Sequence, residues 1–87
     1  MTTETDDVVD GILSVVAAYA NLSIEMSALG YDDDLFHAGM TSHSSVTVML
    51  ELQARFGIEF PDEMLQRSTF ESVSSMRSAV CELLIKS

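Results

Sequence analysis

Apolar residues recur at helical spacing in three stretches of the chain, at about residues 6–20, 42–56 and 70–85. The i, i+3, i+4, i+7 spacing places them on one face of each helix. In the first stretch these are Val9, Ile12, Leu13, Val16, Tyr19 and Ala20. The core-facing row of the second is Met49, Leu52 and Phe56, flanked by Val48, and that of the third is Val73, Met76, Val80, Leu83 and Leu84. The pattern predicts three main helices.

Capping residues indicate where these helices begin and end. Ser42 is the predicted N-cap of the middle helix, because a serine oxygen accepts from the first free N–H groups. Gly57 follows the helix at the position where a left-handed backbone favours glycine. Pro61 and the two acids after it predict a short helix at about 61–66. Ser68-Thr69-Phe70-Glu71 has the form of a capping box before the last helix.

Residues 21–41 show no sustained period and are predicted to form a long loop. A loop of this length in a small domain needs a function or packed anchors. Its candidate anchors are Leu22, Ile24, Met26, Leu29, Leu35 and Phe36. Asp32-Asp33-Asp34 resembles part of a calcium loop but lacks the twelve-residue ligand spacing, so a solvated outer bend is the favoured interpretation.

The 87 residues are enough for one domain, 1–87, and leave little room for a deep catalytic cleft. The chain is 47% apolar and contains one proline and four glycines, which favours a folded helical protein. Strand-like alternation is absent. The expected fold is therefore all-α, a small bundle of three main helices and one short helix.

Charge and cysteine content exclude several classes of function. The net charge is −10, and residues 1–50 contain eight acids and no Lys or Arg, which argues against nucleic-acid binding. The single cysteine, Cys81, cannot form an intramolecular disulfide. Residues 1–7 are acidic, unlike a signal peptide, and the following apolar run is too short to span a membrane. We expect a cytoplasmic monomer that does not bind membranes.

Three local motifs together resemble the acyl carrier protein family. Its signature is an Asp-Ser-Leu triplet that opens the second helix, an apolar helix ending in Phe-Gly, and an Ile-Pro-Asp segment. Here Thr41-Ser42-His43, Phe56-Gly57 and Pro61-Asp62 stand at the same spacing without a gap. The resemblance extends more loosely over nearly the whole chain and implies the four-helix fold of that family. It also implies that Ser42 receives 4′-phosphopantetheine from coenzyme A and that the arm's thiol holds an acyl or aminoacyl group as a thioester.

A helix N-terminus is a favourable place for the phosphate of such an arm, because its N–H groups and dipole attract anions. Thr41, however, replaces the usual aspartate and His43 the usual leucine, while Glu51 is the only acid of the middle helix. The acidic face that docks basic enzymes in this family is therefore largely missing. We expect docking to use the start and outer face of this helix: Thr41, His43, Val46, Thr47 and Leu50.

The stretches 39–46 and 60–70 look closest to stand-alone aminoacyl carriers served by amino acid:[carrier protein] ligases. This resemblance implies three partners: a phosphopantetheinyl transferase, such a ligase or another loading enzyme, and a downstream acceptor enzyme. One alternative is an acyl carrier for a specialised lipid or polyketide pathway. Another is a helical interaction module that lacks the arm.

Enzymatic and metal-binding hypotheses are weaker. Ser42 does not lie in a G-x-S-x-G elbow, and His43, as its immediate neighbour on a helix, does not face it. His37 and His43 lack the i, i+4 relation that would support a metal site with the Asp32–Asp34 run. We therefore predict a non-catalytic carrier without a metal.

Overall fold

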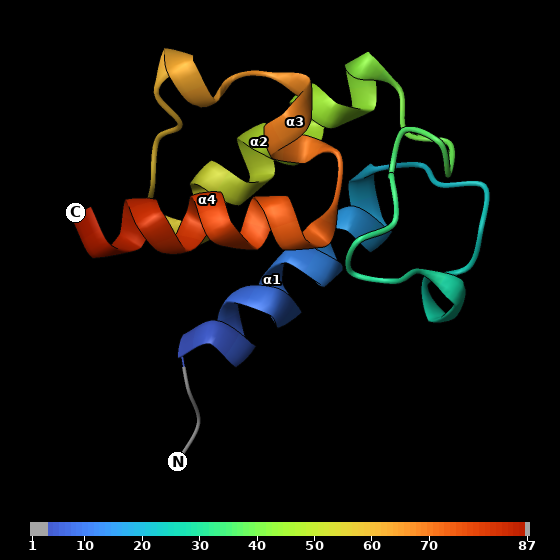
Figure 1. Ribbon diagram of the computed structural model, residues 1–87, viewed down its shortest axis with the longest axis horizontal. Helices are drawn as coiled ribbons and strands as arrows, with labels where there is room; N and C mark the ends of the chain where they lie inside the picture. The colour runs from blue at the N-terminus through green and yellow to red at the C-terminus, as the bar shows by residue number, and fades with distance from the viewer. Residues whose placement is uncertain (1–3, 87) are drawn as a thin grey trace.

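The computed structural model describes residues 4–86, and within this range the chain is helical with no strand (Figure 1). The α-helices are α1 (Glu4–Tyr19), α2 (Ser42–Phe56), α3 (Arg67–Phe70) and α4 (Val73–Lys86). Two short 3₁₀-helices, η1 (Met26–Ala28) and η2 (Asp62–Met64), lie in the connections. The all-α prediction is confirmed, while the first three residues of the acidic N-terminal run lie outside the described residues.

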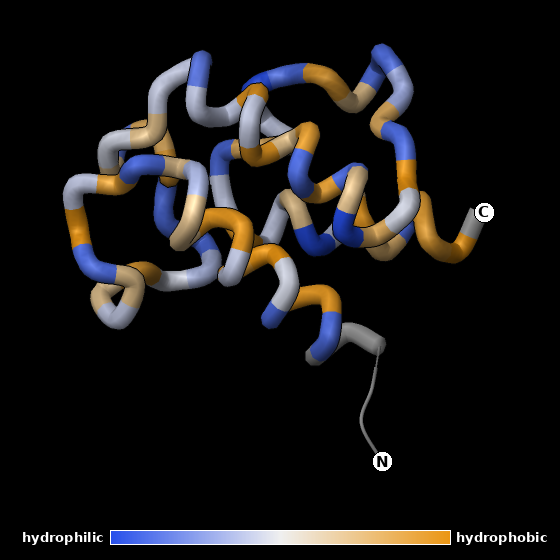
Figure 2. Tube along the Cα trace, turned by 180° about the vertical axis from the view of Figure 1, so that it is seen from behind, coloured by the Kyte–Doolittle hydropathy of each residue, from blue (hydrophilic) through white to orange (hydrophobic). Residues whose placement is uncertain are grey.

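α1 packs against both α2 and α4, and α3 packs against α4. The helices and the long loop all contribute to one core, whose largest fully buried side chains are Ile12, Val16, Leu35, Val48, Leu52, Val73, Met76 and Val80. Apolar and polar positions alternate along each helix in Figure 2, as expected for helices with one buried side. Since the core takes residues from every main helix, packing of these faces holds α2 in place.

The buried faces of α1 and α2 are rotated slightly from the predicted ones. On α1, Val15 is buried and Tyr19 is 39% exposed, so the prediction that Tyr19 faces the core was wrong. Because α1 contacts two helices, its buried face is wide enough to include Val15. On α2, Val48 and Leu52 are completely buried, whereas Met49 is only partly buried.

The predicted start of the last helix was also wrong. Ser68 lies inside α3, and α4 begins only at Val73. The reciprocal capping bonds are instead made by Ser72 and Ser75: the Ser75 N–H donates to Ser72 Oγ at 3.1 Å, and the Ser72 N–H donates to Ser75 Oγ at 3.2 Å. The predicted short helix at 61–66 is the 3₁₀-helix Asp62–Met64, which Pro61 precedes.

The long loop between α1 and α2 is packed onto the junction of α3 and α4. The Leu35 N–H donates to the Glu71 carbonyl at 2.7 Å, and the Ser74 N–H donates to the Tyr31 carbonyl at 2.9 Å. Buried loop side chains are Leu35, Ala38 and Met40, but Ile24 is 40% exposed and is not the anchor that its hydropathy predicted. These contacts hold the end of the loop, which runs directly into α2, against the core.

The acidic bend of the loop has a local structural role. Asp34 Oδ1 accepts from the N–H groups of Phe36 and His37 at 2.9 and 3.3 Å, and Asp33 Oδ2 accepts from the Gly30 N–H at 2.7 Å. Within the described residues no group of three His, Cys, Asp or Glu is placed to hold a metal ion. Asx turns of this kind are ordinary turn chemistry.

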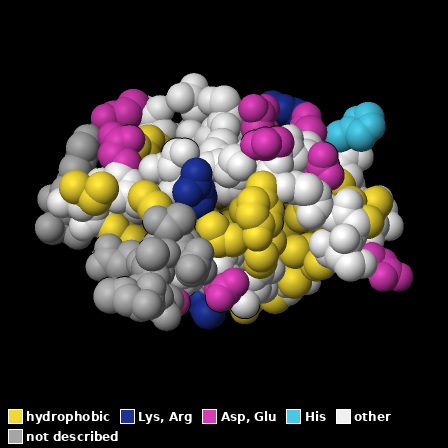
Figure 3. Space-filling view, turned by 60° about the horizontal axis from the view of Figure 1, so that its bottom comes forward, with side chains coloured by type: hydrophobic (Ala, Val, Ile, Leu, Met, Phe, Trp, Pro, Cys, Tyr) yellow, Lys and Arg dark blue, Asp and Glu magenta, His cyan; other side chains and the backbone are white. Residues whose placement is uncertain are grey.

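The molecule is flat, with principal extents of 34 × 33 × 19 Å. Figure 3 shows one face, where hydrophobic side chains gather in the middle below a border of acidic ones. None of the helices in residues 4–86 has the length and apolar character needed to cross a bilayer.

Candidate functional site

The start of α2 is fixed by a reciprocal pair of hydrogen bonds between Thr41 and Ser44. The Ser44 N–H donates to Thr41 Oγ1 at 3.1 Å, and the Thr41 N–H donates to Ser44 Oγ at 2.8 Å. Thr41 has the extended backbone of an N-cap, with φ −98° and ψ 168°. The prediction that Ser42 is the N-cap was therefore wrong: Ser42 is the first residue of the helix.

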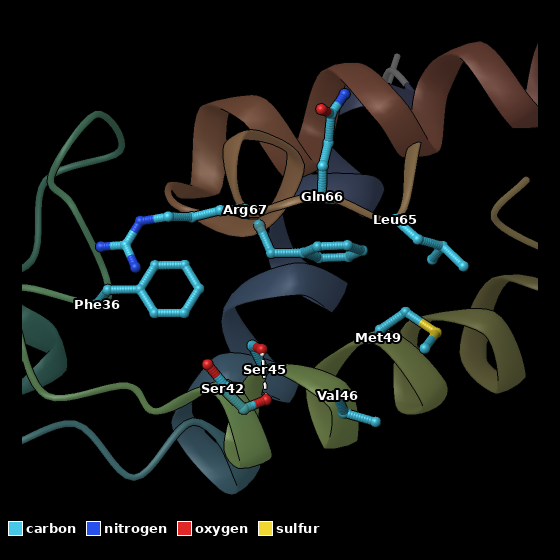
Figure 4. A pocket seen from close by; sticks show the side chains of 9 residues that line it. Phe36, Ser42, Ser45, Val46, Met49, Leu65, Gln66 and Arg67 are labelled. Atoms are coloured by element: carbon cyan, nitrogen blue, oxygen red, sulfur yellow. Dashed lines mark hydrogen bonds between the residues drawn. The ribbon is translucent and has the colours of Figure 1, made fainter. Parts of the chain in front are cut away.

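Because Thr41 caps the helix, the Ser42 hydroxyl is not needed as a capping group. The side chain is exposed, and within residues 4–86 no hydrogen bond uses its Oγ. Its carbonyl accepts from Ser45 Oγ at 2.7 Å, the bond drawn in Figure 4. The first turn of α2 carries no acid. A free hydroxyl thus stands at the positive end of a helix whose dipole no side-chain charge offsets.

Ser44 and Ser45 allow a matched test of this cap. We expect Ser44→Ala to lower the free energy of unfolding by about 1–1.5 kcal/mol, because it removes the buried hydroxyl that satisfies the Thr41 N–H. The corresponding fall in melting temperature is about 5–10 °C for a domain of this size. Ser45→Ala, one residue later, should change stability by no more than about 0.5 kcal/mol. Equal melting curves for the two variants would contradict the capping assignment.

A groove of about 450 Å³ runs beside Ser42, between α2 and the segment that contains α3 (Figure 4). Its lining residues are Phe36, Ser42, Ser45, Val46, Met49, Leu65, Gln66, Arg67 and Phe70. Most of them are apolar, and Arg67 is the one charged side chain among them. The groove is therefore a mostly apolar surface, with the Ser42 hydroxyl among its lining groups.

The Arg67 guanidinium lies over the Phe36 ring, 4.1 Å from its centroid. The two residues come from separate segments, the long loop and α3, and both line the groove (Figure 4). A guanidinium over an aromatic face is a favourable cation–π contact. Sequence reasoning did not identify this pair, because nothing in the local pattern around either residue signals the other.

The predicted docking residues are spread over the exposed start and outer side of α2. Thr41 and His43 are exposed, while Val46 and Leu50 are 50% and 52% exposed. Thr47 is partly buried, with its Oγ1 donating to the His43 carbonyl at 3.5 Å. Sequence reasoning missed a further exposed apolar side chain, Leu65 (45%), which lies across the groove from Val46. Its apolar type after Pro61 suggested a side chain that packs inward, and nothing in the local pattern signalled its exposure.

Gln53 has a structural role at the end of α2. Its Oε1 accepts from the Phe60 N–H at 2.9 Å, which ties the segment after α2 back to the helix. Phe60 is buried and packs edge-to-face on Phe70, with ring centroids 5.2 Å apart. The same contacts shape the floor of the groove, since Phe70 lines it.

Residues 10–77 match the family described as the phosphopantetheine attachment site, and this span includes α2 and the groove. The chain belongs to the phosphopantetheine-binding carrier family. It is 33% identical over 69 residues to the aminoacyl carrier protein of Agrobacterium fabrum, covering 79% of this chain and 83% of that protein. Proteins of this family are substrates of other enzymes, so the carrier is not itself a catalyst.

Solved structures agree with this assignment. The carrier fold superposes, with a TM-score of 0.82 and 31% identity, on a chain in the crystal structure of engineered Bradyrhizobium japonicum glycine:[carrier protein] ligase complexed with carrier protein from Agrobacterium tumefaciens and ATP. The match covers 86% of this chain and 97% of that one. A second structure, B. japonicum glycine:[carrier protein] ligase with its cognate carrier protein and an analogue of glycyl adenylate, matches at a TM-score of 0.67 and 18% identity over 92% of this chain and 99% of that chain, which shows the shared fold alone.

Proposed function

We propose that Ser42 carries 4′-phosphopantetheine and that the chain is a carrier for aminoacyl groups. When bound, the arm supplies a thiol that holds the aminoacyl group as a thioester. The observation that carries the proposal is the exposed, unbonded Ser42 hydroxyl at the first position of α2. The similarity to an aminoacyl carrier protein supports the aminoacyl cargo.

The residues around Ser42 fit a phosphodiester. No carboxylate stands in the first turn of α2, so a phosphate there would meet the helix dipole without a competing anion. In the attachment step Ser42 Oγ bonds to the phosphorus that bears the pantetheine, the pyrophosphate bond of coenzyme A breaks, and adenosine 3′,5′-bisphosphate leaves. No described side chain (residues 7–85) is hydrogen-bonded to Ser42 Oγ, so the hydroxyl proton passes to a base of the transferase or to water.

The partners follow from the same resemblance. The similar Agrobacterium carrier was crystallised with a glycine:[carrier protein] ligase, and we propose that a ligase of this class loads the present chain. A phosphopantetheinyl transferase and a downstream acceptor enzyme complete the set, and we place all of them in the cytoplasm. Docking would use Thr41, His43, Val46, Thr47 and Leu50. With one acid on α2, apolar contact contributes more to docking than charge does.

The test is an intact mass after incubation with coenzyme A, Mg²⁺ and a broad-specificity phosphopantetheinyl transferase. We expect a gain of one phosphopantetheine on the wild type, none on Ser42→Ala, and the full gain on Ser45→Ala, whose serine lines the same groove. An unmodified wild type, with a circular dichroism spectrum of a folded helical protein and a transferase active on a control carrier, would contradict the proposal and favour the armless interaction module.

The modified protein then decides the cargo. Incubation with ATP, glycine or alanine and an amino acid:[carrier protein] ligase should add one aminoacyl group that hydroxylamine removes, as expected for a thioester. The apolar groove also suits an acyl carrier. Loading by an acyl ligase with a fatty acid, together with no aminoacyl loading, would assign the chain to that second class.

A further inference from the structure

We propose that Arg67 binds the phosphodiester on Ser42 and so holds the root of the prosthetic arm against the groove. The inference rests on the proposed attachment at Ser42. It assigns to Arg67 a positioning role, since the guanidinium would act on the arm and not on the cargo.

Charge makes Arg67 distinctive. The chain has four Lys and Arg residues against fourteen Asp and Glu, and no Lys or Arg precedes Arg55. Against this background Arg67 is the one charged residue in the wall of the groove that Ser42 also lines. Among the residues that line the groove, Arg67 is therefore the one whose charge would attract a phosphodiester at Ser42. Opposite charges at such a partly apolar surface attract more strongly than in open solvent.

The guanidinium is free to bind an anion. Among the side chains that the structure describes, residues 7–85, it contacts the face of the Phe36 ring at 4.1 Å, and no carboxylate of that range pairs with it. Stacking occupies the face of the guanidinium and leaves the N–H groups at its edge available to phosphate oxygens. Arginine contacts of this planar kind suit phosphate better than lysine contacts do.

Phe36 keeps the guanidinium near the groove. The Phe36 N–H donates to Asp34 Oδ1 at 2.9 Å. This bond holds the Phe36 backbone, and with it the ring, in the turn of the loop that precedes α2. The next residues of that turn lead directly to Thr41 and Ser42. The ring, the guanidinium and the attachment serine are thus carried by one packed unit, and less side-chain entropy is lost when Arg67 meets the phosphate.

The experiment compares the modified and unmodified forms of four proteins: wild type, Arg67→Gln, Arg67→Lys and, as a matched control, Arg55→Gln, whose arginine is exposed and does not line the groove. Intact mass first confirms the modification of each. In the wild type we expect the Arg67 Nε–H resonance to move on modification and the ³¹P resonance of the phosphodiester to shift between low and high salt. We also expect modification to raise the melting temperature, because a new ion pair forms at the helix start.

For Arg67→Gln, we expect modification to raise the melting temperature much less than in the wild type. The ³¹P resonance of the modified variant should also shift much less between low and high salt. Arg67→Lys should retain part of both, and Arg55→Gln should behave as the wild type. Comparing the two forms within each variant cancels the loss of the Phe36 contact, which affects both. An Arg67→Gln protein with the wild-type gain and ³¹P behaviour would overturn the role of Arg67, whereas failure of the wild type to gain mass would overturn the attachment at Ser42 instead.

Discussion

Replacing Leu35 with alanine is expected to lower the free energy of unfolding by about 3 kcal/mol, since it removes a completely buried side chain and leaves a cavity. A domain of this length has about 4–13 kcal/mol in total, so the loss is a large share of it. The melting temperature should fall by about 12–24 °C. Thermal and urea unfolding, followed by circular dichroism, would measure both quantities.

The effect is large because Leu35 belongs to a loop that behaves as part of the core. Its N–H donates to the Glu71 carbonyl, so the residue joins the loop to the segment between α3 and α4 through both backbone and side chain. The matched control is Leu50→Ala, the same substitution at a side chain that is 52% exposed, where we expect a change within about 0.5 kcal/mol. Similar losses at the two positions would show that the loop is not packed as described.

A packed loop has a consequence for the carrier. The segment that leads to Ser42 is held by backbone bonds at both of its ends: Ser23 to Ala38 near α1, and Met40 to Leu35 near α2. The hydroxyl is therefore presented from a fixed helix start, while the mobile part of the working carrier would be the arm itself. If Ser42 carries the arm as proposed, such a chain could present it to more than one enzyme without a pocket that matches each of them.

Local signals predicted α2 well. Its observed range, Ser42–Phe56, is the range that the apolar spacing predicted, and Gly57 adopts the left-handed conformation, with φ 64°. The resemblance at Phe56-Gly57 and Pro61-Asp62 led to the family that the comparison of residues 10–77 shows. These signals depend on neighbours a few residues apart, which is why the sequence alone carries them.

Features that depend on contacts between distant segments were not predictable in this way. The cap of α2 is a local exception: serine is favoured over threonine at an N-cap, but the pairing of Thr41 with Ser44, three residues on, makes Thr41 the cap. The capping-box pattern at Ser68–Glu71 was misleading. The Glu71 carbonyl accepts from the Leu35 N–H of the long loop, and α4 begins only after Glu71, at Val73. The groove, too, is lined by three separate segments that no periodicity relates.

The second large effect is expected at Gly39, three residues before Ser42. Its φ is +123°, where side chains other than glycine's are strained, and a Cβ added there would lie 2.8 Å from the Ser23 backbone nitrogen. Backbone atoms held by the bond from Ser23 to Ala38 have little freedom to retreat. We expect Gly39→Ala to lower the free energy of unfolding by about 3 kcal/mol, from strain and collision together.

Gly57→Ala separates the two contributions. Gly57 also has a positive φ, +64°, but a Cβ there would meet nothing within 4 Å, so this variant should lose only the conformational preference, about 1 kcal/mol. Repeating Gly39→Ala in a Ser23→Gly background removes the Ser23 side chain and keeps its nitrogen. If the nitrogen is the obstacle, most of the loss persists there. Full recovery in that background would place the collision on the side chain, and equal losses for Gly39→Ala and Gly57→Ala would show that no collision occurs at the loop that precedes Ser42.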